Sequence, residues 1–241
     1  MRRLVDSILG ERALAAIAPF AVWMALMPLL PATAAGYAIR TFATLAALCV
    51  AVPFLRRRSG DGATRLEAAP STCGRPSCLA VGLSVGLVVG VAVAVAWIAP
   101  EYSAVYRKWF VVGAAPNPAE PYASEYAPGK CGWTLTIIRV IGSAFVIAPV
   151  EELFFRSYLY RRLIGVEWRD ESLRRFDLEA FVWMCALFAL EHNRPLAAVM
   201  AGAAYGWTFI RFGFASAATA HIVTNLLLGI YVVVFDAWVF W

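Results

Sequence analysis

The chain of 241 residues is 61% hydrophobic and only 15% charged, and its mean hydropathy is +0.69. Soluble globular domains are about half apolar and a quarter charged, so this composition excludes an ordinary soluble domain and favours a membrane protein. The formal net charge of +5 does not indicate nucleic-acid binding, because the basic residues cluster between apolar segments, where they orient a membrane protein.

Seven segments are long and apolar enough to be transmembrane helices, since about 20 residues cross about 30 Å of hydrocarbon. We therefore expect an all-α polytopic membrane protein with about seven spans, within a range of six to eight. In chain order the predicted spans are Ala13–Leu30, Tyr37–Leu55, Cys78–Ala99, a fourth from Trp133 through APVEELFFRSYLYRRL (148–163), Phe176–Glu191, Pro195–Ile210 and Ala215–Val234.

The polar stretches between the spans predict the topology. Residues 56–76 are basic and rich in Gly, Ser and Pro, which is typical of a loop, and residues 101–132 form a second, proline-rich loop. With a cytoplasmic N-terminus, fourteen Arg and Lys residues fall on the cytoplasmic side and five on the outer side. This positive-inside excess predicts an integral membrane protein with its N-terminus in the cytoplasm and its C-terminus outside. We expect the membrane to be the bacterial inner membrane.

The loops divide the chain into two parts with different chemistry. We expect residues 1–131 to form an N-terminal membrane scaffold of three spans and their loops, in which the spans consist almost entirely of small and aliphatic side chains. Gly82, Gly86 and Gly90 recur every fourth residue there, which predicts a helix face that a neighbouring helix approaches closely. We expect residues 132–241 to form a back-half helix bundle and to be the core that carries any catalytic site, because the polar residues within spans are concentrated in it.

Ionisable residues inside this core are functional candidates, because a charge at the bilayer centre costs about 2.5–3.5 kcal/mol on insertion scales. Glu152 and Arg156 are one helical turn apart with the acid first, which predicts an ion pair. Glu151 points about 100° away around the helix and is left without that partner, and Pro149 is expected to kink this span. The remaining candidates are Glu191, both histidines of the chain, His192 and His221, and Asn225.

These side chains favour hydrolysis by direct attack of water. A carboxylate beside an imidazole can act as the general base for water, and a second imidazole with an amide can stabilise a developing oxyanion. HExxH is absent, and the single GxSxG match, at residues 82–86, lies inside an apolar span. A nucleophile elbow needs a strand-to-helix turn, so covalent serine catalysis is weakly supported. No cofactor is expected, although a divalent metal held by Glu191, His192 and His221 from separate helices stays open.

Three motifs occur in order, each on its own apolar span: EExxxR at residues 151–156, FxxxH at 188–192 and HxxxN at 221–225. Together they resemble the CAAX protease and bacteriocin-processing family of intramembrane endopeptidases, which includes the Ras-converting CAAX prenyl endoprotease. The resemblance covers roughly residues 132–234. Size and layout also resemble a bacterial subgroup that occurs with exosortase-type protein-sorting systems.

The resemblance implies a role for each residue of the motifs. Glu151 and His192 would activate the hydrolytic water, His221 and Asn225 would stabilise the oxyanion, and Glu152 and Arg156 would shape the site. The substrate would be a membrane protein or peptide in the lipid bilayer, prenylated or otherwise lipid-anchored, and the active site would open toward the cytoplasm.

Two other classes of function stay open. A non-catalytic bacteriocin-immunity protein or protein-sorting partner would use the same polar groove for binding alone. A transporter would use the glutamates and histidines as a proton relay, but the inverted repeats expected of many transporters are not visible in this sequence.

Overall fold

The computed structural model describes residues 10–56, 76–113, 116–165, 168, 172 and 174–241. The basic loop predicted at residues 56–76 therefore lies almost wholly outside the described residues. The regular structure within these ranges is helical. Its elements are α2 (Glu11–Leu26), α3 (Ala34–Arg56), α4 (Pro76–Ile98), η1 (Ala99–Tyr102), α5 (Ala104–Phe110), α6 (Pro128–Gly142), η2 (Ser143–Ile147), α7 (Ala148–Glu152), η3 (Leu153–Tyr160), α8 (Arg161–Ile164), α9 (Leu178–Ala189), α10 (Pro195–Phe212), α11 (Phe214–Val234) and η4 (Trp238–Phe240).

Each predicted span coincides with a helix or, for the fourth, with the continuous helical run from α6 to α8. Within the described ranges, four segments are long and apolar enough to cross a membrane: α3, α4 with η1, the α6–α8 run, and α11. The 12 residues of α9 extend only about 18 Å at 1.5 Å per residue, which is too short for a complete crossing. The chain is thus an all-α membrane protein, and its helices differ in how far they reach.

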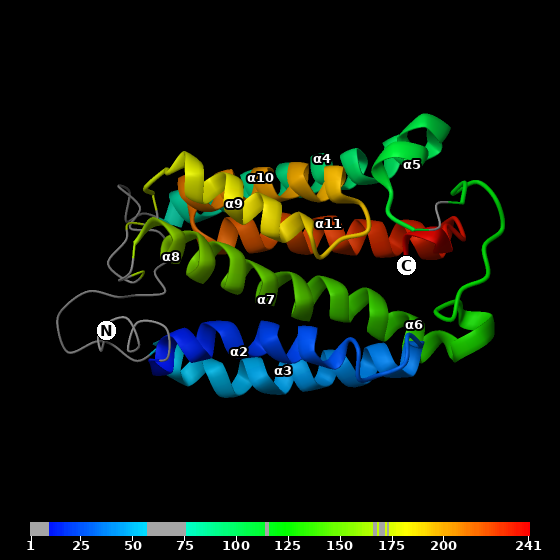
Figure 1. Cartoon of the computed structure of the whole chain (residues 1–241), viewed down its shortest axis with the longest axis horizontal. Coiled ribbons are helices and arrows are strands. Elements are labelled where there is room, and N and C mark those ends of the chain that lie inside the picture. Colours follow the sequence, from blue (N-terminus) through cyan, green and yellow to red (C-terminus); the bar gives the residue numbers. More distant parts are fainter. Residues whose placement is uncertain (1–9, 57–75, 114–115, 166–167, 169–171, 173) are drawn as a thin grey trace.

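The helices lie side by side in one elongated bundle (Figure 1). The pair α2 and α3 flanks the α6–α8 run on one side, and α4, α9, α10 and α11 lie on its other side. The start of α2 and the helix α8 are at one end, which we call the α8 end; the C-terminus and the start of α6 are at the opposite end, which we call the C-terminal end.

The glycine face predicted on α4 packs against α11. A Cβ on Gly86 would lie 2.5 Å from the carbonyl oxygen of Ser216, so only glycine allows this approach of the two helices. One turn further, Thr224 Oγ1 donates a 3.0 Å hydrogen bond to the carbonyl oxygen of Gly90. The prediction of close helix packing at these glycines is confirmed, and α4 thereby helps to position α11.

The segment that carries the paired glutamates departs from regular α-helix. The five residues of α7 lie between two π-helical stretches, η2 and η3. In a regular helix Pro149 lacks an N–H and its ring collides with the carbonyl four residues earlier; here the wider turn of η2 directly precedes it. Such π-helical turns are frequent at functional sites, and this one determines how the two acids face the bundle.

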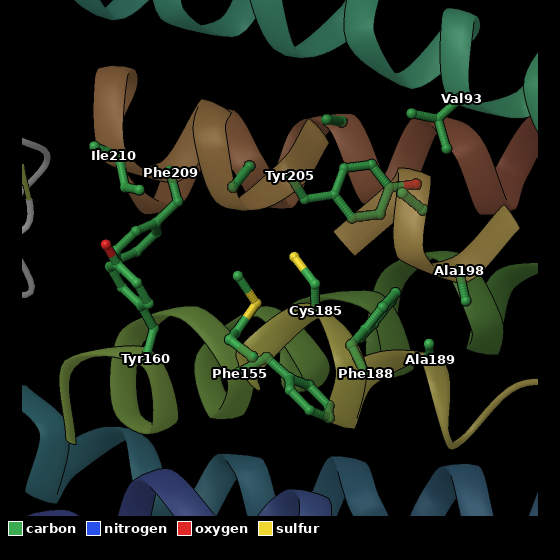
Figure 2. Packing of buried hydrophobic residues seen from close by; sticks show 14 of the residues in the cluster. Val93, Phe155, Tyr160, Cys185, Phe188, Ala189, Ala198, Tyr205, Phe209 and Ile210 are labelled. Carbon is green, nitrogen blue, oxygen red and sulfur yellow. The ribbon is translucent and has the colours of Figure 1, made fainter. Parts of the chain in front are cut away.

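A buried aromatic cluster fills the space between η3, α9 and α10 (Figure 2). Phe155, Tyr160, Phe188, Tyr205 and Phe209 are each 1% exposed. Within this cluster, Tyr160 and Phe209 lie on the side toward the α8 end. These side chains form a packed layer between the glutamates and the α8 end of the bundle.

Candidate active site

The Glu152–Arg156 ion pair predicted from spacing is confirmed. Glu152 Oε1 lies 3.1 Å from Arg156 Nη1, and both side chains are completely buried. Arg156 Nη2 also donates to the carbonyl oxygen of Gly202 on α10, at 3.3 Å, and the guanidinium lies 4.4 Å from the centroid of the Phe188 ring. The pair therefore neutralises two buried charges and ties the α7–η3 segment to α9 and α10.

Glu152 has a second partner, the imidazole of His221 on α11. His221 Nδ1 lies 2.9 Å from Glu152 Oε1, and because a carboxylate paired with arginine accepts hydrogen bonds, Nδ1 is the donor. The ring is also stacked on Tyr205, with centroids 4.7 Å apart and planes inclined by 22°. The imidazole is thus held on one nitrogen and on one face.

The other nitrogen of His221 faces Glu151. The Nε2 atom lies 3.7 Å from Glu151 Oε2, within ion-pair range but longer than a hydrogen bond. Glu151 differs from Glu152 in its surroundings, because it lines a cavity of about 180 Å³ while Glu152 lies behind the cavity wall. The two adjacent acids are therefore separated into a buried, ion-paired carboxylate and a carboxylate that faces open space.

His192 and Asn225 line the same cavity as Glu151 and His221. His192 lies three residues beyond the end of α9, and its Nδ1 donates to the carbonyl oxygen of Phe188 at 2.8 Å. Asn225 Nδ2 donates to the carbonyl oxygen of Ser143 in η2, at 3.0 Å. All four residues expected to be catalytic thus meet at one space, where several water molecules fit.

The family resemblance implies that Glu151 and His192 act on one water molecule, and in the structure each of them is held by a different neighbour. Among the described residues, the ion pair of Glu151 is with His221, whereas His192 binds Phe188 and packs edge-on against Trp97 of α4, with ring centroids 5.5 Å apart. A group bound in the cavity between them, such as a water molecule, would have to link Glu151 to His192.

Several residues at the site could not be identified from the sequence. Trp97 and Tyr205 line the cavity as aromatic walls, and Ser143 supplies a backbone acceptor. Arg139 also lines the cavity, and its guanidinium lies over aromatic rings. No spacing rule predicts these neighbours, because they are brought together by packing of distant helices.

The cavity faces the C-terminal end of the bundle. Trp97, Arg139, Arg194, Phe240 and Trp241, which come from that end, form part of its lining. The aromatic layer described above lies on the other side, toward the α8 end, where α2 also begins.

Within the described ranges, no group of three or more His, Cys, Asp or Glu residues is placed to hold a metal ion. The set of Glu191, His192 and His221, which the sequence left open as metal ligands, is therefore not assembled as one.

Comparison with known proteins gives one match. Residues 133–227 match the family model described as type II CAAX prenyl endopeptidase, Rce1-like. The matched segment contains all three motifs and agrees with the part of the chain in which the sequence resemblance was found. No curated protein and no solved structure matches the chain.

Proposed function

We propose that the protein is an intramembrane protease that hydrolyses a peptide bond in a membrane protein or membrane-associated peptide, with Glu151 as the general base. The match of residues 133–227 to the CAAX prenyl endopeptidase family model supports this proposal. The observation that supports this most is the shared cavity. Glu151, His192, His221 and Asn225 come from three separate parts of the core and all line it.

In the proposed reaction, Glu151 accepts a proton from water as the water oxygen attacks the substrate carbonyl carbon. His192 donates through Nδ1 to Phe188, so in the neutral ring Nε2 is an acceptor that can orient the same water. When the tetrahedral intermediate collapses, Glu151 returns its proton to the leaving amine. The only co-reactant of the peptide is water.

The developing oxyanion would be stabilised by donors on α11. Asn225 uses one N–H to bind Ser143, which leaves its second N–H for the substrate. His221 is held at Nδ1 by Glu152, so it can donate to the oxyanion when Nε2 also carries a proton. Donors that are already oriented in a site shielded from water contribute strongly to catalysis, and Glu152 and Arg156 would act by holding this imidazole in place.

The substrate would enter from the C-terminal end of the bundle. The positive-inside count places that end on the outer side of the membrane, so we propose that the scissile bond is cleaved in the outer half of the bilayer. This replaces the expectation of a cytoplasmic opening. A prenylated peptide is the first candidate substrate, because the matched family is described by that substrate.

The test is cleavage of defined peptides by the purified protein in proteoliposomes. The probes are an internally quenched farnesylated peptide with a CAAX terminus and a pool of synthetic transmembrane peptides, with products identified by mass spectrometry. Glu151→Gln and Glu151→Ala are expected to lower turnover by about 10²–10⁴-fold, as loss of a general base does. Asn225→Ala is expected to lower it by about 10²–10³-fold.

His192→Ala is expected to lower turnover as well, whereas Glu179→Gln, which changes an exposed carboxylate on α9, serves as the matched control and should retain full activity. Undiminished cleavage by a folded Glu151→Gln variant would refute the proposed base. A wild-type protein that binds these peptides without cleaving them would instead support the bacteriocin-immunity or sorting-partner function.

A further inference from the structure

Three arginines lie at or behind the cavity, and two of them are neutralised. Arg156 pairs with Glu152, and Arg194 Nε lies 2.9 Å from Glu101 Oε1 in a second buried ion pair. Arg139 lines the cavity but has neither a carboxylate partner nor a hydrogen-bond acceptor among the described residues, and its Nε is shielded from solvent. Arg139 as a whole is partly buried, and charges withdrawn from water are ordinarily paired, so its missing partner requires an explanation.

Aromatic rings hold the Arg139 guanidinium without neutralising it. Its central carbon lies 4.3 Å from the ring centroid of Tyr37, 4.1 Å from that of Tyr126 and 5.2 Å from that of Trp241. Such cation–π contacts stabilise the charge and fix its position. They do not use the N–H donors as conventional hydrogen bonds do, so the planar fork that binds carboxylates remains available.

The position of Arg139 fits a second point of attachment for a bound peptide. Arg139 precedes Glu151 by 12 residues on the same helical run, which corresponds to about 18 Å at 1.5 Å per residue. An extended peptide spans at most about 3.3–3.6 Å per residue, so about five residues would connect the two points. Ser143 and Asn225 line the cavity between them.

We infer that Arg139 binds a carboxylate of the substrate about five residues from the scissile bond and thereby contributes to specificity. The carboxylate is either the C-terminal α-carboxylate of the substrate or an Asp or Glu side chain, since both present the same two oxygens. This inference rests on the proposed peptidase function, because it assigns an additional subsite to the same cavity.

Arg40 on α3 provides a matched control. It also lies over aromatic rings, 4.5 Å from the Trp23 centroid and 5.6 Å from that of Tyr37, and its Nε likewise has no hydrogen-bond partner in the described part of the chain. It does not line the cavity. Exchange of Arg40 therefore removes a similar stacked cation without removing the proposed contact.

The experiment measures peptide capture by the inactive Glu151→Gln variant in detergent, so it does not require turnover. The probe is a pool of N-palmitoylated octapeptides with four randomised C-terminal residues, each as free acid and as C-terminal amide, quantified by mass spectrometry. We expect free acids to be retained about ten- to hundredfold better than amides, the range expected for loss of a charged hydrogen bond. This preference should disappear with Arg139→Gln, weaken with Arg139→Lys and persist with Arg40→Gln.

The outcomes separate the two carboxylate sources. Retention of amidated peptides that contain Asp or Glu, lost on replacement by Asn or Gln, would assign the subsite to an acidic side chain. Equal capture of acids, amides and their Gln counterparts, or capture of no peptide, would overturn the inference. Cleavage by the wild type without carboxylate preference would overturn only this subsite, whereas a carboxylate preference without cleavage would retain it and contradict the peptidase function.

Discussion

Replacement of Gly90 by alanine tests whether the packing of α4 against α11 positions the catalytic residues. A Cβ at this position would lie 2.5 Å from the carbonyl oxygen of Ala220 and 2.7 Å from the Cβ of Val223. Both atoms are fixed parts of α11 and cannot turn away as the end of a flexible side chain does. The helices must therefore separate, which also lengthens the hydrogen bond from Thr224 to Gly90.

The loss of stability expected for Gly90→Ala follows from comparison with Gly82→Ala in the same helix. A Cβ on Gly82 would meet the hydroxyl oxygen of Ser216 at 2.5 Å, and that hydroxyl can rotate away. Alanine is the better helix former at both positions, so this gain cancels between the variants. The remaining difference is overpacking, about 1–3 kcal/mol. For a chain of this size, about 2 kcal/mol lowers Tm by roughly 4–8 °C.

The assay compares thermal unfolding of the two variants in detergent, followed by tryptophan fluorescence, and their peptide cleavage at a temperature at which both are folded. Gly90→Ala should unfold at the lower temperature and lose about tenfold or more in turnover, because a displacement of about 1 Å at a catalytic group can cost up to 10²-fold. Equal Tm and equal turnover would refute the view that α4 positions α11.

Three further predictions follow from the ion pair, the reaction and the topology. Arg156→Ala should destabilise the protein by about 3–5 kcal/mol, because it leaves Glu152 buried without its countercharge; thermal unfolding should show partial recovery when Glu152→Gln is added. Peptide cleavage should persist after thorough chelation of metal ions. Loss of cleavage on chelation and its recovery on addition of zinc would contradict a metal-free reaction. Single cysteines introduced at 57–75 should react with impermeant thiol reagents only from the cytoplasmic side and one at Tyr122 only from the outer side; the reverse would overturn the orientation.

Spacing along the helix was sufficient to predict the contacts that are local or periodic. Glu152 and Arg156 are four residues apart and meet despite the π-helical turns around them. The three glycines of α4 share one face, which packs against α11 as expected. In both cases the helical repeat alone determines which side chains lie together, so the sequence carries the necessary information.

Contacts between distant residues were not predictable in this way. The hydrogen bond from His221 to Glu152 joins residues 69 apart, and the Arg194–Glu101 ion pair joins residues 93 apart. Both depend on how complete helices pack. His192, which the family resemblance pairs with Glu151 in activating the water, is hydrogen-bonded to Phe188, while the histidine within ion-pair range of Glu151 is His221.

The distance of Glu151 from the two ends of the bundle does not by itself determine from which end a substrate reaches it. Glu151 lies 13 residues from Ile164 at the α8 end and 23 from Pro128 at the other end of the same helical run, about 20 and 35 Å respectively. It is thus closer to the α8 end, which supported a cytoplasmic opening. However, Tyr160 and Phe209 on that side are only 1% exposed, whereas Arg139 on the longer side lines the cavity, which is why we propose entry from the C-terminal end. Access therefore follows the packing of side chains rather than the distance to the nearer surface.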